Sequence, residues 1–513
     1  MMSPLKVLVS IISLFVVLGV VSIIYPDGGI HVGDVTLRYP KLTEIFEKQA
    51  ATDSLSDSTQ VDPEDAIREM MEATKRQEFA AFSDSLKFYE NFFKKGKTRF
   101  DLPNNDPTWF DRFFLHLELA SLDSNVVHIV HYGDSQLEED RISATIREDL
   151  QDEFGGAGPG MMPAIMTVPS QTTSHSGTGA LSRYILFGPK EEEADHSRYG
   201  PLAQFAKLEG EAAITIQRRK ERKKQFSHVG GYSTIKLLTN KNAHIKTKLN
   251  VNQTFVDGEK RTTKVVEAGE PAIETYNKLK VYTWKLKDTT SIAKMYLSGN
   301  GEIYAIAADG AYGVAVDNVA MRGSSGTIFH RIDAELLAES YKAMNARLII
   351  MEYGGNLVPG TSSSNIEWTK KIITRQIQTI QKVNPDADIL FIGPADMAHQ
   401  KDGEWKTYAG LNMTIRALRE VALDNGAAYW DMHRVMGGNG SMIKWVNKEP
   451  ALGFTDHIHF TRRGAAYMGD LFCAALRMHY DYFKFRDRHN ISDEKLKDIH
   501  NWRDKEKKTE AKK

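Results

Sequence analysis

Cysteine and net charge are what this sequence has least of. Its 513 residues include one cysteine, Cys473, so the chain can form neither an internal disulfide nor a thiolate metal cluster. Lysine and arginine (66) almost balance aspartate and glutamate (67), which leaves a formal net charge of -1. A dedicated nucleic-acid binder would usually carry a strongly basic domain. We therefore expect an ordinary globular protein with no nucleic-acid partner.

One long run without charge stands at the N-terminus. Residues 7–25, VLVSIISLFVVLGVVSIIY, contain no charged side chain. About 20 apolar residues suffice to cross a bilayer as a helix. A cleavable signal peptide would have a shorter apolar core and a small-x-small exit. Segment 1–26 is therefore predicted to be a single-pass signal anchor. Lys6 precedes this run, and a positively charged flank favours the cytoplasmic side of the membrane. The residues after the run are therefore expected in the periplasm or outside the cell.

The segments at either end of the folded part are polar. Residues 27–104 are predicted to form a helical stem, because the run 62–93 repeats apolar residues at spacings of three and four. No heptad pattern is sustained long enough to predict a coiled coil. Residues 486–513 are almost wholly charged and are predicted to be a solvated tail.

Strands and helices alternate over residues 105–169 and 312–485. The predicted strands are 126–130, 347–353, 387–393 and 427–432, and the predicted helices are 138–154, 365–383 and 411–426. Strands that alternate with helices of this length indicate a parallel sheet covered on both faces. The fold class is therefore α/β, with one three-layer domain built from two parts of the chain.

The stretch 170–311 interrupts this alternation. It holds short segments of period-2 alternation, rich in β-branched and aromatic residues and separated by Asn, Gly and Asp. An inserted all-β, sandwich-like module is the prediction. Its aromatic residues Tyr282, Trp284 and Tyr304 would usually face a sandwich core, and stacking on sugar rings is the alternative.

Four short motifs contain residues whose side chains or backbone groups can serve in catalysis. Ser135, in HYGDSQ, follows a predicted strand and precedes a helix. Gly323 and Asn356 follow two further strand-like runs, and Asp456 and His459 stand three apart before an amphipathic helix. In open α/β sheets ligands bind at the carboxyl ends of the strands. We therefore expect these motifs to meet at one edge of the sheet.

Together these residues suit acyl transfer. A serine hydroxyl attacks only when a base takes its proton, and the base needs a group that fixes its tautomer. Ser135 is the predicted nucleophile, His459 the base and Asp456 the orienting carboxylate. The N–H groups of Ser135 and Gly323 and the amide of Asn356 are the predicted oxyanion donors. The alternative for Ser135 is a helix N-cap.

The remaining histidines near these motifs are assigned other roles. His457 does not have the required spacing from Asp456, and it is predicted to line the cleft or face solvent. His457, His459 and Asp456 lack a further ligand at suitable spacing, so we predict no metal and no cofactor. His128 and His131 alternate with apolar residues and are predicted to lie in the core.

The order of the motifs resembles the SGNH (GDSL-like) hydrolase superfamily. Its blocks match Gly-Asp-Ser at 133–135, Gly323, Gly-x-Asn at 354–356 and Asp-x-x-His at 456–459. The resemblance covers roughly residues 110–165 and 312–480, and it implies a flavodoxin-like sheet. Two departures are Leu357, where Asp is common, and Gln136 in place of Leu, which we interpret as having no catalytic role.

The segments GDSQLEEDRIS and GGAGPGMMP, together with the β insertion, resemble exported bacterial enzymes of the peptidoglycan O-acetylesterase type. This resemblance implies an acetylated glycan substrate and a carbohydrate-binding-like module beside the cleft. The predicted function is an extracytoplasmic serine esterase that removes O-acyl groups, in particular O-acetyl groups, from a polysaccharide. An O-acetyltransferase supplied by a membrane acyl-transfer partner and a non-catalytic glycan-binding protein remain the alternatives, and a lipid ester substrate also stays open.

Overall fold

The computed structural model describes residues 30–32, 35–37, 82–190, 193–219, 226–257 and 260–492. The chain divides into two units, residues 1–81 and residues 82–513. In the first unit, strands β1 (Ile30–Val32) and β2 (Val35–Leu37) pair antiparallel. The predicted membrane helix of residues 1–26 and most of the predicted tail lie outside the described residues. Within the described ranges, no helix combines the length and apolarity needed to cross a bilayer.

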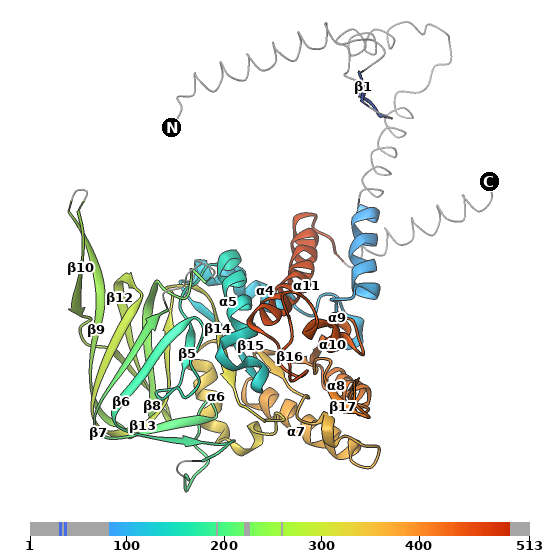
Figure 1. Ribbon diagram of the computed structural model, residues 1–513. Coiled ribbons are helices and arrows are strands. Elements are labelled where there is room, and N and C mark those ends of the chain that lie inside the picture. The colour runs from blue at the N-terminus through green and yellow to red at the C-terminus, as the bar shows by residue number, and fades with distance from the viewer. Residues whose placement is uncertain are drawn as a thin grey trace, which may run out of the picture. The chain divides into compact units, whose positions relative to one another are not determined.

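A six-stranded sheet forms the centre of the second unit (Figure 1). Its strands, in spatial order, are β14 (Gly313–Ala320), β4 (Val126–Gly133), β15 (Ala346–Glu352), β16 (Asp388–Ile392), β19 (Ala428–Trp430) and β3 (Phe100–Asp101). All neighbours pair parallel except β3, which runs antiparallel to β19. The strands read as nearly continuous apolar runs because both faces of the sheet are buried.

Helices cover both faces, which confirms the predicted parallel-sheet α/β domain. One face packs against α4 (Asp111–Leu122), α5 (Arg141–Phe154) and α11 (Arg462–Arg488), and the other against α6 (Ala334–Ala343), α7 (Ile366–Val383) and α8 (Leu411–Asp424). The helices are amphipathic as expected: in α7, Ile373, Ile377 and Ile380 lie on one stripe and are fully buried.

Within the predicted stem, residues 27–104, the structure describes a helix over residues 82–95 and also the short strands β1, β2 and β3, so its described part is not helical throughout. The aromatic side chains of this helix pack on α11, with ring-centroid distances of 5.2 Å for Tyr89 to Tyr482 and 4.5 Å for Phe93 to His479. Aromatic contacts therefore hold this part of the predicted stem against α11 of the α/β domain.

The β module predicted over residues 170–311 forms an antiparallel sheet of nine strands, the first of which, β5, lies before the predicted boundary. Its strands are β5 (Gly160–Met162), β6 (Thr173–Ile185), β7 (Gln204–Arg218), β8 (Tyr232–Asn240), β9 (His244–Asp257), β10 (Lys260–Glu267), β11 (Ala272–Thr275), β12 (Leu279–Thr290) and β13 (Ile292–Asp309). We call strands β5 to β13 the β module.

The long strand β13 joins two branches of this sheet, where the sequence had suggested a sandwich. Its first part pairs with β7 and β9, and its last part pairs with β8 and β5. The change of partners coincides with Gly299 and Gly301, whose φ values are 129° and 157°. It also coincides with a register shift between Ile303 and Ala305. Glycine and a bulge allow one strand to bend from one branch into the other.

The aromatic residues of the β module face inward. Tyr282, Trp284 and Tyr304 are 5%, 2% and 0% exposed. The indole N–H of Trp284 donates to the Gly269 carbonyl oxygen over 3.1 Å. Core packing, rather than stacking on sugars, is therefore their role.

His128 fastens the β module to the central sheet. On β4, its Nδ1 lies 2.9 Å from Asp317 Oδ2 of β14, and its Nε2 lies 3.5 Å from Asp309 Oδ2 at the end of β13. Asp317 also accepts the backbone N–H of Met161 of β5 over 2.6 Å. Burial alone would lower the pKa of His128, but the two carboxylates outweigh burial and raise that pKa to about 10. The predicted core position of His128 is confirmed. Its side chain forms buried ion pairs with Asp309 and Asp317, which we call the His128 joint.

Replacing this imidazole should weaken the joint in a pH-dependent way. The pKa of His128 in the folded chain lies above its ordinary value. The stabilisation that the charged imidazole gives to the folded state is therefore complete below about pH 6.5 and is lost as the pH rises through about 10. We expect His128→Asn to lower the free energy of unfolding by about 3–5 kcal/mol near pH 6, and by much less near pH 10. Thermal and urea unfolding across that range measure this; a difference that does not vary with pH would contradict the charged joint.

Candidate active site

Ser135 stands just beyond the carboxyl end of β4, where the chain turns sharply. It opens a 3-10 turn over Ser135–Asp140, and α5 begins only at Arg141. A side chain at Gly133 would not fit, because its Cβ would lie 2.6 Å from the Leu137 side chain. The Asp134 carboxylate accepts the N–H of Gln136 over 3.0 Å and so caps the turn. Ser135 is therefore not the cap, and its hydroxyl has another partner.

That partner is His459. Ser135 Oγ lies 2.7 Å from His459 Nε2, and His459 Nδ1 lies 2.7 Å from Asp456 Oδ2. The other Asp456 oxygen accepts the N–H groups of Ile458 and His459 over 2.9 and 3.0 Å. Between them, His457 takes a left-handed φ of 58°, which turns the chain back toward Asp456. The structure thus brings the three predicted catalytic side chains into one hydrogen-bonded chain.

The Asp456 carboxyl is held in its charged form. Burial raises its pKa, but the hydrogen bonds from the His459 side chain and from the two backbone N–H groups outweigh burial, and the net pKa is lowered. A carboxylate at this position accepts Nδ1–H and leaves Nε2 of His459 as the acceptor facing Ser135. This is the arrangement that a general base requires.

These side chains open onto a cavity of about 200 Å³ at the carboxyl edge of the sheet. Ser135, Asn356 and His459 all line it, together with Asp134, Gln136, Glu352, Tyr353, Gly355, Pro359, Gly393, Pro394, Ala395, Met397, Met432 and Ile458. The walls come from the ends of β4, β15, β16 and β19, as ligand sites in parallel sheets do.

Asn356 is already hydrogen-bonded in this cavity. Its Nδ2 donates to Asp134 Oδ2 over 3.1 Å and to the Ser324 carbonyl oxygen over 3.0 Å. An amide nitrogen carries two hydrogens, so an oxyanion would have to displace one of these two acceptors. Burial, reinforced by the nearby Glu352, raises the pKa of Asp134 to about 7 despite its hydrogen bonds. Near neutral pH this carboxyl is therefore a weaker competitor than an ordinary carboxylate.

Gly323 lies in an exposed turn after β14, with a φ of 78°. The turn starts close to the segment that bears Ser135, since the N–H of Met321 donates to the Gly133 carbonyl oxygen over 2.8 Å. Gly323 itself is not among the residues that line the Ser135 cavity. The roles of Ser135, Gly323 and Asn356 as oxyanion donors all stay predictions; of the three, Ser135 and Asn356 line the cavity.

The two remaining histidines are accounted for by packing. His457 is 6% exposed, and its ring stacks on Trp405 at a centroid distance of 3.6 Å. The expectation that His457 lines the cleft or faces solvent is therefore wrong. His131 is fully buried and pairs with Glu352 over 3.0 Å, in the predicted core position. No cluster of three or more His, Cys, Asp or Glu side chains suited to a metal occurs among the described residues.

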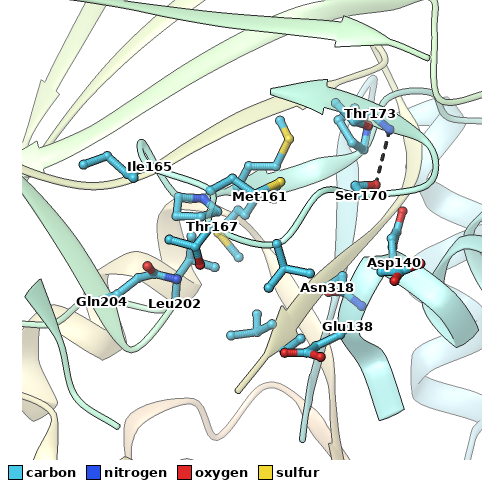
Figure 2. Close-up of a pocket in the computed structure, with 18 of the residues that line it drawn as sticks. Glu138, Asp140, Met161, Ile165, Thr167, Ser170, Thr173, Leu202, Gln204 and Asn318 are labelled. Atoms are coloured by element: carbon cyan, nitrogen blue, oxygen red, sulfur yellow. Dashed lines mark hydrogen bonds between the residues drawn. The ribbon is translucent and has the colours of Figure 1, made fainter. Parts of the chain in front are cut away.

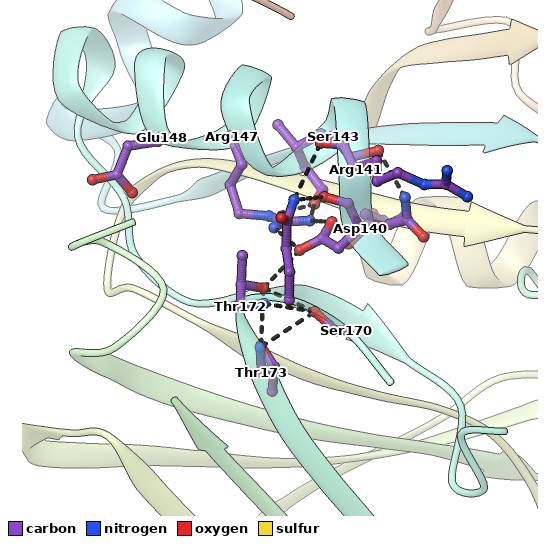
Figure 3. A network of polar contacts seen from close by, with 12 residues as sticks. Asp140, Arg141, Ser143, Arg147, Glu148, Ser170, Thr172 and Thr173 are labelled. Carbon is purple, nitrogen blue, oxygen red and sulfur yellow. Dashed lines mark hydrogen bonds and ion pairs between the residues drawn. The ribbon is translucent and has the colours of Figure 1, made fainter. Parts of the chain in front are cut away.

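Hydrogen bonds from α5 and from the segment just before β6 stabilise the turn that carries Ser135. Glu139 and Asp140 both adopt left-handed φ values, 63° and 64°, which cost free energy in residues other than glycine. Arg147 of α5 donates to both carboxylate oxygens of Asp140 over 2.7 and 3.0 Å. Thr172, just before β6, donates to the same carboxylate over 2.7 Å. Figure 3 shows this buried network, which holds the strained turn in place.

A second cavity lies on the other side of this turn (Figure 2). Its volume is about 110 Å³. Glu138, Asp140 and Asn318 line one side, and the β-module side includes Met161, Ile165, Thr167, Leu202 and Gln204. Ser135, His459 and Asp456 do not line it. The predicted catalytic pair Ser135 and His459 therefore lines the first cavity and not this one.

The comparisons with known proteins bear on the fold. No family model matches the chain, and no curated protein sequence matches it. A solved structure of a peptidoglycan O-acetylesterase is similar, with 17% identity, a TM-score of 0.51 and coverage of 72% of this chain and 95% of that one. The chain therefore shares the fold of that structure. The predicted resemblance is thereby confirmed at the level of the fold.

Two other structures match less closely. An acetyl xylan esterase has 17% identity and a TM-score of 0.25, over 32% of this chain and 81% of its own. A family two carbohydrate esterase from Cellvibrio japonicus has 11% identity and a TM-score of 0.23, over 60% and 99%. With TM-scores this low, only the first comparison supports the fold.

Two residues near the site have contacts that the sequence pattern does not indicate. Gln136, for which the sequence predicts no catalytic role, bonds the backbone on both sides of His459 with its side chain. Arg141 was not singled out, and its buried guanidinium reaches the carbonyl oxygens of Ser135 and Phe460. The one available signal was the departure at Gln136, where the family usually has leucine.

Removing the Asp456 carboxylate should test the hydrogen-bonded chain. In Asp456→Asn, His459 loses its charged partner and the tautomer that directs Nε2 at Ser135. We expect kcat for p-nitrophenyl acetate to fall by about 10³- to 10⁴-fold. Asp402→Asn, in the exposed turn of the hairpin β17 (Ala398–Lys401) and β18 (Glu404–Thr407), is the control and should retain activity. An Asp456→Asn enzyme within tenfold of the wild type would contradict the assigned role.

Proposed function

We propose that this protein is a serine esterase that removes O-acetyl groups from a polysaccharide through an acyl-serine intermediate. The observation that carries the proposal is the continuous chain Ser135–His459–Asp456, with both links at 2.7 Å, on the wall of a cavity. The fold shared with a peptidoglycan O-acetylesterase supports the choice of an acetylated glycan as substrate.

The chemistry follows from the geometry. Ser135 Oγ attacks the ester carbonyl carbon while His459 Nε2 takes the hydroxyl proton. The tetrahedral oxyanion binds the N–H of Ser135 and the Asn356 amide, which exchanges one of its present acceptors for it. In this proposal Gly323 supplies a third donor.

Collapse of the intermediate completes the first half. The C–O bond to the sugar breaks, the sugar oxygen takes the proton from His459, and an acetyl group stays on Ser135. Water then attacks this ester while His459 takes the proton of the water, and acetate leaves as Ser135 regains its hydrogen. Neither half requires a metal or cofactor.

We also propose that the enzyme works outside the cytoplasm, anchored by residues 1–26. The support is the uncharged run of residues 7–25, which is long enough to span a bilayer. The anchor would keep the catalytic domain close to glycans exported across that membrane.

The substrate can be tested directly with the full-length protein in detergent. Acetylated peptidoglycan, acetylated xylan and an acetylated exopolysaccharide are incubated with the wild type and with Ser135→Ala, and free acetate is measured. We expect acetate release from at least one glycan by the wild type, and a loss of about 10⁴-fold or more in Ser135→Ala. Equal release by the two proteins would contradict the proposal.

A second arm separates hydrolysis from transfer. Isotope-labelled acetyl groups are supplied on the donor glycan together with a non-acetylated glycan. The proposed esterase should place the label in free acetate. Label on the second glycan would show the acetyltransferase alternative, and binding without any turnover would show the non-catalytic one.

A further inference from the structure

The catalytic histidine sits on a segment that needs an external support. Ser135 and His459 are 324 residues apart in the chain. Residues 456–460, which we call the His459 segment, lie between α10 (Ser441–Val446) and α11, and the His459 and Asp456 side chains are 29% and 46% exposed. A 2.7 Å contact between Oγ and Nε2 therefore depends on how this segment is held against the Ser135 turn.

Gln136 supplies two of the bonds between them. Its Nε2 donates to the Ile458 carbonyl oxygen over 2.7 Å, and its Oε1 accepts the N–H of Phe460 over 3.2 Å. Ile458 and Phe460 are the residues on either side of His459. The residue directly after the nucleophile thus fixes the backbone on both sides of the base, as one strand would fix another.

Arg141 supplies a third bond and ties it to the nucleophile. Its Nη1 donates to the Phe460 carbonyl oxygen over 3.0 Å, and its Nη2 donates to the Ser135 carbonyl oxygen over 2.8 Å. Its Nε donates to the Glu138 carbonyl oxygen over 2.9 Å. The side chain is 6% exposed. The planar guanidinium holds donors in a rigid fork that can bridge two segments, which a single ammonium cannot do.

The carboxylates of Asp140 and Glu138 are bonded by other arginines, so the Arg141 guanidinium bonds backbone carbonyl oxygens instead. The nearby carboxylate of Asp140 is bonded by Arg147 on the same helix (Figure 3). The carboxylate of Glu138 is bonded by Arg322 over 2.8 and 2.6 Å. The three hydrogen bonds of the Arg141 guanidinium described above go to backbone carbonyl oxygens, and they set the distance between two segments.

We propose that Gln136 and Arg141 are positioning residues that clamp the His459 segment onto the Ser135 turn. The clamp rests on the proposed serine-esterase function, because it acts through the pair Ser135 and His459. Neither side chain needs to touch the reacting atoms. Loosening the clamp misplaces Nε2, and a displacement of about 1 Å can cost about 10² in rate. The loss should fall on kcat and leave KM for a small ester nearly unchanged.

Gln136→Leu tests the clamp with little change in volume. We expect kcat for p-nitrophenyl acetate to fall by about 10- to 100-fold, KM to stay within about twofold, and Ser135 to react correspondingly more slowly with a fluorophosphonate. Gln151→Leu is the matched control. Gln151 is buried, whereas Gln136 is half-buried, and its side chain likewise bonds the backbone at two points, donating to the carbonyl oxygens of Gly158 and Val314 over 3.2 and 3.1 Å. It should lose stability and keep its kcat.

A pair of arginine variants separates positioning from stability. Arg434 also donates to two backbone carbonyl oxygens, those of Lys97 and Arg99 over 3.2 and 2.7 Å, and it does not line the Ser135 cavity. Arg141→Lys and Arg434→Lys both keep a positive charge and lose the fork. Arg141→Lys should lower kcat and the labelling rate, whereas Arg434→Lys should lower the melting temperature and keep kcat when assayed well below it. If Arg141→Lys does not fold, Gln136→Leu alone decides.

The outcomes are distinct. Wild-type kcat and labelling rate in Gln136→Leu would overturn the clamp, and so would a loss that only matches a smaller folded fraction. A wild-type protein that neither hydrolyses the ester nor reacts with the fluorophosphonate would overturn the proposed function itself. Loss of kcat at constant KM in Gln136→Leu, with Gln151→Leu unaffected, supports the clamp.

Discussion

The hydrogen bond between Ser135 Oγ and His459 Nε2 is the interaction on which the site depends. A serine hydroxyl has almost no nucleophilicity until a base can take its proton. Here the base comes from a segment 324 residues away in the chain, and it reaches Ser135 at 2.7 Å. The parallel sheet makes this meeting possible, because it sends the chain back to the same edge after every helix.

The surroundings of this bond are arranged to keep it short. The Asp456 carboxylate hydrogen-bonds Nδ1 of the imidazole. Gln136 and Arg141 hydrogen-bond the backbone of the His459 segment. The turn that bears Ser135 is itself strained, with two consecutive left-handed residues. Buried bonds from α5 and from the start of β6 offset that strain. The β module thus contacts the Ser135 turn through the hydrogen bond from Thr172 to Asp140. It contacts the central sheet through the ion pairs of His128.

The sequence was sufficient to predict the central elements and the three side chains Ser135, His459 and Asp456 that the fold brings together. Strong periodicity located the strands and helices, and the spacing of Asp456 and His459 located the dyad. Periodicity could not show that β13 serves two branches of one sheet, because such a bend depends on glycines and a register shift within a continuous strand. Nor could it show the burial of His457 under Trp405, or the bonds of Gln136 and Arg141, which join segments more than 300 residues apart.

The central claim is that Ser135 carries the acyl group during turnover. Its most direct test is rapid quenching of the full-length enzyme during hydrolysis of an acetyl ester, followed by mass spectrometry of its peptides. The account predicts an acetyl group on the peptide containing Ser135, at the serine itself, which disappears when the substrate is exhausted. An acetyl group on another residue, or hydrolysis with no acylated peptide under conditions where deacylation limits the rate, would contradict it.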